Sequence, residues 1–264
     1  MIFSYHERMN QYELPGVSAV EKGLELFLAL VEASGTVPLS EIAQQTGVPI
    51  STAHRLLGPY LRCGLLSRIG RGRYSVGLRL ATIAQHADTN TILINASRPP
   101  LRRLARDHGL TVHLGVLEGD MVTYLVKEHG GGMAILTQEM NQLEGYGSAL
   151  GKVLLAHLDG SAQDAYLAGG PFVPLTTNTI TDPGALRESF QIIRQQGYAF
   201  DNAEVDAGLY CLAVPVPGPD GNVHCAISLS CHSQEPIGLT MLPHMQHCVA
   251  SIRENLGLQA KISN

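Results

Sequence analysis

Residues 39–66 read LSEIAQQTGVPISTAHRLLGPYLRCGLL, and this stretch decides the fold of the N-terminal part of the chain. A short helix is expected to open at residues 38–40, with Ile42 and Ala43 facing inward, and apolar side chains recur at helical spacing over residues 53–61, which predicts two short amphipathic helices. Gly47 lies between them and can adopt the positive φ that ends a helix. Ser40 is expected to cap the first helix. Two short helices joined by a glycine-containing turn predict a helix-turn-helix.

The outer face of the second helix carries polar and basic side chains near its N-terminus, where base edges in the major groove come within reach. These candidate base-contacting residues are Ser51, Thr52, His54 and Arg55. Gly58 and Pro59 interrupt the helical pattern, because proline removes a backbone hydrogen bond and its ring clashes with the preceding turn. We therefore expect this helix to kink or end near Leu57.

A helix over residues 20–33 precedes this unit, and a basic hairpin follows it. Residues 65–68 and 73–76 alternate around Gly70 and Gly72, which predicts two strands and a tight turn. The tip carries Arg68, Arg71 and Arg73. A basic hairpin directly after a helix-turn-helix is a wing that suits phosphates or the minor groove. We place this winged helix-turn-helix domain at residues 14–77.

The distribution of charge supports a polyanionic partner. The net charge of the whole chain is −5, yet residues 42–87 contain six arginines and no Asp or Glu. Phosphate contacts depend on local rather than global charge, so this block is suited to double-stranded DNA, here an operator. A helical unit with a hairpin could instead be a protein-docking module. The lack of carboxylates over both elements disfavours that alternative.

Length and composition are those of a globular protein with room for two domains. The chain has 264 residues, of which 45% are hydrophobic and 16% charged. The longest apolar runs are too short to span a membrane, and residues 1–12 lack the apolar segment of a secretory signal. The five cysteines include no CxxC pair, which suits reduced thiols. We expect a cytoplasmic protein with no membrane partner.

Residues 78–98 are predicted to form a linker helix with an apolar stripe that is free to pack against a second copy of the chain. Pro99 and Pro100 are expected to mark the start of the C-terminal domain, residues 99–264. The pattern there is α+β, with strands expected over 111–117, 121–127, 198–202, 209–216 and 223–231. Asp182, Pro183 and Gly197 bracket one of its helices as N-cap, first residue and C-terminal glycine. Other helices are expected over 101–108, 148–158 and 240–256.

The strand over residues 225–231 carries an unusual polar face. Its odd-numbered positions are apolar or thiol, whereas Ser228 and Ser230 share the opposite face with Ala226. Buried hydroxyls need hydrogen-bond partners, and a carboxylate or carbonyl ligand can supply them. Neighbouring backbone groups or a place at a sheet edge would satisfy these serines equally well, so the pattern alone leaves both interpretations open.

The chain resembles the IclR-type family of bacterial transcription regulators, in the expected order over residues 17–257. Besides residues 39–66, the resemblance is carried by GRYSVGLRL (72–80), LGKVLLA (150–156), RQQGYAFDNAEVDAGLYCLAVPV (194–216) and HCAISLS (224–230). It implies a GAF-like α/β effector-binding domain after the linker helix. It also implies a dimer or a dimer of dimers.

The resemblance further implies an effector site. Eight residues fall on or beside the family's effector-contacting positions: Tyr146, Ser148, Ala149, Asp201, Leu209, Cys211, Ser228 and Ser230. Ser148 and Ala149 match a helix N-terminus that receives an anion. Tyr146 stands where the family often has His, and its ring and hydroxyl indicate an aromatic or larger effector. The implied function is a repressor or activator that senses a small organic acid and needs no cofactor.

A metal or thiol enzyme that carries an accessory winged helix is the competing class. Cysteines and histidines crowd the C-terminal third, and His244 and His247 have ligand-like spacing, but no CxxC or HExxH frame is present. Cys211 lies in an apolar run, which raises a thiol pKa and makes the group inert. Gly-rich phosphate loops and serine elbows are also missing from the sequence. We therefore expect no catalytic residue and no metal site.

Overall fold

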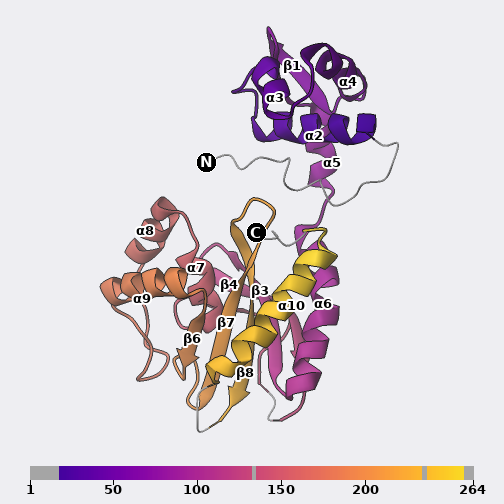
Figure 1. Ribbon diagram of the computed structural model, residues 1–264. Coiled ribbons are helices and arrows are strands. Elements are labelled where there is room, and N and C mark those ends of the chain that lie inside the picture. The colour runs from indigo at the N-terminus through magenta and orange to yellow at the C-terminus, as the bar shows by residue number, and fades with distance from the viewer. Residues whose placement is uncertain (1–17, 133–134, 234–236, 259–264) are drawn as a thin grey trace. The chain divides into compact units, whose positions relative to one another are not determined.

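The computed structural model describes residues 18–132, 135–233 and 237–258 (Figure 1). The chain forms two compact units, Met1–Asp88 and Thr89–Asn264. Within the described residues, no helix combines the length and the apolar character needed to cross a membrane.

The first unit is a winged helix-turn-helix, as predicted. Its elements are α2 (Ser18–Glu32), α3 (Leu39–Gln45), α4 (Ile50–Arg62), the antiparallel strands β1 (Leu66–Gly70) and β2 (Arg73–Val76), and α5 (Leu78–Gln85). Leu26 and Leu30 of α2, Ile42 of α3 and Leu57 of α4 are buried together and form its core with Leu66 of the hairpin. The helical and alternating patterns of the sequence therefore set this fold.

The predicted N-cap of α3 is wrong. The helix begins at Leu39, with Pro38 in the cap position, and no side chain caps it. The Leu39 N–H instead donates to the carbonyl of Gly72 at 2.7 Å, and the Leu39 side chain is buried. The hairpin thus fixes the start of the helix one residue before Ser40.

The helix α4 does not end near Leu57, one of the two outcomes predicted, because it runs through Pro59 to Arg62. The Tyr60 ring stacks on Phe27 with centroids 4.9 Å apart, and this packing holds the turn after the proline. Arg55 and Pro59 are both exposed, so water can reach the Arg55 carbonyl that the proline leaves without a donor. The cost of one lost helical bond is therefore small here.

The region predicted as a single linker helix is two helices, α5 and α6 (Thr89–His108). The two units divide between Asp88 and Thr89, and Pro99 and Pro100 lie inside α6 rather than at a boundary. Pro100 leaves the Ala96 carbonyl without its helical donor. Asn255 Nδ2, from the end of the chain, donates to that carbonyl at 2.8 Å. This contact satisfies the backbone, and α6 continues.

The second unit is a six-stranded antiparallel sheet with helices on both faces. The strand order is β5–β4–β3–β8–β7–β6. The strands are β3 (Thr111–Glu118), β4 (Met121–His129), β5 (Gln142–Glu144), β6 (Ala199–Asn202), β7 (Leu209–Pro217) and β8 (Val223–His232). The α+β prediction is confirmed, although the sequence did not indicate β5.

The helices α6 and α10 (Leu242–Asn255) cover one face of this sheet, and α7 (Ala149–Ala156) with α9 (Pro183–Gln196) covers the other (Figure 1). The predicted caps of α9 are confirmed. The Asp182 side chain accepts from the Ala185 N–H, and Gly197 adopts φ 80°. A further helix that the sequence did not indicate, α8 (Gly160–Ala168), is capped by Asp159, whose side chain accepts from the Ala162 N–H.

Candidate DNA-binding surface and effector site

The exposed face of α4 carries all four predicted base-contacting residues. Ala53 and Leu57 point into the core, whereas Ser51, His54 and Arg55 are exposed and Thr52 is half-buried. Inner and outer positions alternate with the helical period, so the polar residues gather on one side near the N-terminus of α4. Such a face can enter a groove without disturbing the core.

The β1–β2 hairpin presents three exposed arginines. Arg68 lies on β1, with its guanidinium carbon 5.8 Å from the Tyr74 ring centroid. Arg73 pairs with Gly70 in the ladder, and Arg71 lies in the turn between them. With no carboxylate between residues 42 and 87, this tip is uniformly basic. The geometry is that of a wing able to contact phosphates.

The sheet register gathers the predicted effector residues on one face. Asp201 lies opposite Cys211, and Cys211 opposite Ser230, in antiparallel ladders whose paired residues share a face. Ser228 pairs with Ala213 on the same face. The core over this face includes Tyr146, Ala149 and Leu209, and Ser148 caps the covering helix. All eight residues are buried.

The N-terminus of α7 presents backbone donors of the kind that bind anions. Ser148 Oγ accepts from the Gly151 N–H at 3.0 Å, while the N–H groups of Ala149 and Leu150, in the first turn, have no acceptor within the helix. Gly151 is required here, because a Cβ at that position would overlap the backbone of Gly145.

Three buried charged residues lie beside this turn. Lys152 Nζ and Glu204 Oε1 are 2.5 Å apart, and their side chains are only 3% and 5% exposed. Asp201 Oδ1 accepts from the Glu204 N–H at 2.7 Å. Burial raises the pKa of Asp201 to about 6, against the opposing effects of that backbone hydrogen bond and of Lys152. The group is therefore poised to titrate near neutral pH.

Several buried polar atoms on this face have no partner among the described residues. They are Asp201 Oδ2, Glu204 Oε2 and His113 Nδ1. His113 lies opposite Ser228, and its Nε2 is 2.8 Å from Thr137 Oγ1. Burial and the charge of Lys127 lower the pKa of His113 to about 3, so its ring is neutral. Unpartnered buried groups are costly, and a bound ligand is one way to satisfy them.

Residues 85–252 match the family described as the bacterial transcriptional regulator IclR C-terminal domain, and residues 19–70 match the IclR helix-turn-helix domain. The chain belongs to the IclR family. The HTH-type transcriptional regulator KdgR of Escherichia coli is 32% identical over 216 residues, which are 81% of this chain and 82% of that protein. XynR, an HTH-type transcriptional regulator of the same organism, is 30% identical over 219 residues, 82% of this chain and 87% of that protein.

Solved structures of IclR-family proteins share the fold. A putative IclR transcriptional regulator from a Silicibacter species is 26% identical, with a TM-score of 0.67 over 93% of this chain and 99% of that chain. An IclR homologue from Microbacterium hydrocarbonoxydans, complexed with 4-hydroxybenzoate, is 24% identical, with a TM-score of 0.60 over 89% and 99%. These relatives are transcription regulators. The chain is accordingly a DNA-binding regulator with an effector-binding domain, and not an enzyme.

The Tyr146 hydroxyl, expected to face the effector of this IclR-family site, is hydrogen-bonded within the protein. Its hydroxyl donates to the Val173 carbonyl at 2.7 Å and accepts from the Val173 N–H at 3.1 Å. The ring lies 4.9 Å from that of Phe172. The hydroxyl expected to face an effector is therefore engaged with the segment that follows α8, and Tyr146 contributes an apolar wall instead.

The sequence prediction missed His113, Lys152 and Glu204. Residues 111–117 alternate in the same way as the serine strand, with Thr111 and His113 on one face and apolar residues on the other, so the same rule would have found His113. Lys152 is the only charged residue of α7, and a lone lysine in an apolar helix signals a buried partner. No sequence pattern singles out Glu204, which lies in an irregular turn.

The cysteines of the IclR-family domain are structural in character. Burial raises the pKa of Cys211 well above its usual range, and it raises those of Cys225 and Cys248 to about 12. Cys225 and Cys248 pack in the core under α6 and α10. His244 and His247 are exposed, and no three His, Cys, Asp or Glu side chains of the described residues are grouped to hold a metal ion.

Proposed function

We propose that this IclR-family regulator recognises its operator through the exposed face of α4 and holds the DNA backbone with the wing. Arg55, with Ser51, Thr52 and His54, contacts bases, because these side chains project from the first turns of α4. Arg68, Arg71 and Arg73 contact phosphates. The observation that supports this division is the exposure of these side chains on a surface without a carboxylate.

We further propose that the effector is a small hydroxylated organic acid bound between α7 and the sheet. The observation that carries this proposal is a pair of buried carboxylate oxygens, Asp201 Oδ2 and Glu204 Oε2, that have no hydrogen-bond partner in the described part of the chain. Carboxylates only accept hydrogen bonds, so the ligand must donate to them, as a hydroxyl does. Its own carboxylate binds the α7 turn at Ser148 and Ala149, with Ser228 and Ser230 as further donors. The ligand of the Microbacterium hydrocarbonoxydans homologue, 4-hydroxybenzoate, belongs to this chemical class.

The surface of α5 supports the proposal that the DNA-binding unit self-associates. No residue of α5 is buried, and Leu78 and Ile83 on this helix are 84% and 52% exposed. Exposed apolar residues on one short helix mark an interaction surface. Two copies would present paired recognition helices to half-sites about 34 Å apart, on a roughly palindromic operator. We infer a dimer or a dimer of dimers that acts on chromosomal DNA in the cytoplasm.

Footprinting on the chain's own upstream region, repeated with candidate acids, tests the first proposal. Protection of an inverted repeat is expected, and the absence of any protected site would overturn the proposal. Calorimetric titration of 4-hydroxybenzoate and of gluconate, an aromatic and an aliphatic hydroxy acid, tests the second. Binding of neither acid would count against the proposed ligand class.

Ser230→Ala should weaken binding of the acid that binds by about tenfold or more, because a hydrogen bond to a charged ligand contributes about 1.5–3 kcal/mol. Ser251→Ala is the matched control, since Ser251 lies on α10 and donates to the His247 carbonyl. Operator affinity without effector should stay unchanged in both variants. Normal binding by Ser230→Ala would place the pocket elsewhere.

A further inference from the structure

The sheet face that carries Asp201, Cys211, Ser228 and Ser230 is called the effector face below. One end of the segment between β4 and β5 is hydrogen-bonded to this face. The part of it that concerns us is residues 135–141. The Thr137 hydroxyl lies 2.8 Å from His113 Nε2. Lys127 Nζ donates to the carbonyls of Ile135 and Thr137, both at 2.6 Å. The segment therefore shares two side chains, His113 and Lys127, with the face on which the candidate site is built.

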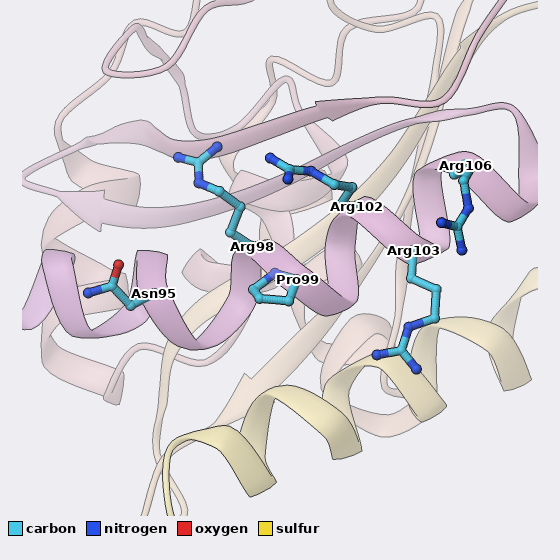
Figure 2. A pocket seen from close by; sticks show the side chains of 6 residues that line it. All are labelled: Asn95, Arg98, Pro99, Arg102, Arg103 and Arg106. Carbon is cyan, nitrogen blue, oxygen red and sulfur yellow. The ribbon is translucent and has the colours of Figure 1, made fainter.

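The same segment is tied to α6 at its other end. The Arg98 guanidinium donates twice to Glu139, at 2.7 and 3.1 Å, and Glu139 also accepts from the Lys127 N–H at 3.1 Å. Arg98 and Arg102 also bond Glu128, at 3.2 and 3.0 Å. Figure 2 shows Arg98 and Arg102 turned toward the strands, whereas Arg103 points toward α10. These arginines line an open depression of about 430 Å³ on the side of the sheet opposite α7.

Side chains of strand β4 link this segment to both faces of the sheet. Lys127 and Glu128 are consecutive, so their side chains point to opposite faces. Lys127 binds the segment beside the effector face, and Glu128 binds arginines of α6 on the other. The ladder between β4 and β5 covers residues 121–123, at the far end of the strand. Residues 135–141 thus connect a site under α7 with a helix on the reverse side.

Polar contacts, rather than apolar burial, hold this segment in place. Ile135 is buried, but Leu136 and Met140 are 93% and 63% exposed. Segments that bury little apolar surface shift at low free-energy cost. The position of residues 136–140 is therefore set by hydrogen bonds: the side-chain contacts with His113, Lys127 and Arg98, and the backbone bond from the Met140 N–H to the Tyr124 carbonyl of β4 at 2.7 Å.

The His113 ring can convert ligand binding into a change in these bonds. A neutral imidazole has one donor nitrogen and one acceptor nitrogen. Nδ1 is buried and has no partner within residues 18–132, 135–233 and 237–258, whereas Nε2 lies 2.8 Å from the Thr137 hydroxyl. A ligand oxygen that accepts from Nδ1 fixes the proton there, so Nε2 must accept from the Thr137 hydroxyl. A ligand hydroxyl that donates to Nδ1 leaves the ring proton on Nε2, so Nε2 must donate to the Thr137 hydroxyl. Either ligand selects one of two arrangements of residue 137.

We propose that Arg98 and Glu139 are positioning residues that transmit occupancy of the effector site to α6 through residues 135–141. The proposal rests on the effector site described above. Helix α6 begins at Thr89, the first residue of the second unit, and residues 86–88 join it to α5 of the DNA-binding unit. A displacement of α6 is thereby passed along the chain toward the winged helix. Arg98 acts through Glu139 and does not touch the effector.

A double-mutant cycle in the full-length protein tests the proposal without needing the effector. Thr137→Val removes the hydroxyl at the site end, and Arg98→Ala breaks the contact at the helix end. The readouts are hydrogen exchange of the α6 amides and operator affinity. In the native background, Thr137→Val should speed exchange over residues 89–98 and change the operator Kd by about threefold to tenfold. With Arg98→Ala present, the same change should alter neither readout.

Two controls separate transmission from stability. Arg103→Ala removes an exposed arginine of the same helix that points away from the segment, and Arg187→Ala breaks a 2.6 Å ion pair with Asp164 elsewhere in the domain. Thr137→Val should keep its full effect in both. Glu139→Gln replaces Arg98→Ala if the latter does not fold.

Equal effects of Thr137→Val with and without Arg98, or no effect in the native background, would overturn the proposal. If the native protein did not bind an operator at all, the proposed function would be refuted. The hydrogen-exchange data would still show whether residue 137 and α6 are coupled.

Discussion

Replacing Asp201 with Asn should stabilise the ligand-free protein at pH 8, although most substitutions of buried residues destabilise. Asp201 is 1% exposed, and burial raises its pKa from an ordinary 3.8 to about 6. The folded state holds the carboxyl proton of Asp201 more tightly than the unfolded state does. The stabilising contribution of the protonated Asp201 is therefore complete below pH 3.8. It is lost as the pH rises through about 6.

The magnitude follows from the shift. Roughly two pH units correspond to about 3 kcal/mol of destabilisation once the carboxylate is charged in both states, at pH 8. At pH 5 the destabilisation by Asp201 is roughly half of its value at pH 8. Asn keeps an oxygen that can accept from the Glu204 N–H, a bond of 2.7 Å in the native protein, but carries no charge. Asp201→Asn should therefore raise the free energy of unfolding by up to about 3 kcal/mol at pH 8, and by less at pH 5.

Differential scanning calorimetry at the two pH values measures this difference. For a domain of this size the gain corresponds to a rise in Tm of about 6–12 °C at pH 8. Asp120→Asn, at the exposed turn between β3 and β4, is the control and should leave Tm unchanged. Equal destabilisation by Asp201→Asn at both pH values would show that hydrogen bonds to the carboxylate outweigh its desolvation, and would refute the reasoning. The variant should also bind effector more weakly, because the amide N–H₂ that replaces Oδ2 cannot accept a hydrogen bond from a ligand hydroxyl.

Three further outcomes are expected. Arg55→Ala should cost about 1–3 kcal/mol on the operator and relax its sequence preference, whereas Arg71→Ala should weaken all DNA alike, as salt titrations on specific and random DNA would show. Glu204→Gln leaves the Lys152 charge buried without its counter-ion, so urea unfolding should reveal a loss of about 3–5 kcal/mol, and a loss below 1 kcal/mol would contradict the buried pair. Leu78→Asp should reduce the mass measured by light scattering, and an unchanged mass would exclude α5 from the interface.

Elements set by local signals could be predicted from the sequence. Helix α9 begins and ends where its aspartate, proline and glycine indicate, because each acts on the backbone of its own turn. The wing follows from alternation and glycine spacing. The errors arose where a distant group compensates a local defect. Asn255 donates to the Ala96 carbonyl, which Pro100 leaves without its helical donor. No local sequence pattern near Pro100 predicts a contact with a residue so far along the chain.

The candidate site was predictable only in part, for the same physical reason. Strand alternation placed Ser228 and Ser230 on one face, and pairing with Cys211 and Asp201 agrees with the resemblance. The Lys152–Glu204 pair depends on how α7 packs against the turn after β6, which is tertiary information. The involvement of Tyr146 with Val173 depends likewise on a loop whose course the sequence does not fix.

The two faces of the same strands argue that the polar face serves binding rather than stability. On β3, Val112 and Leu114 are fully buried among apolar side chains under α6 and α10. The alternating residues Thr111 and His113 are as deeply buried on the face toward α7, yet the His113 ring keeps an unpartnered nitrogen. Replacing buried ionic groups with apolar residues of similar size is often neutral or stabilising, so packing alone does not require this chemistry. A domain that completes one face as an apolar core, and leaves unsatisfied acceptors and a neutral imidazole among the described residues of the other, supports the proposal that this second face binds the effector.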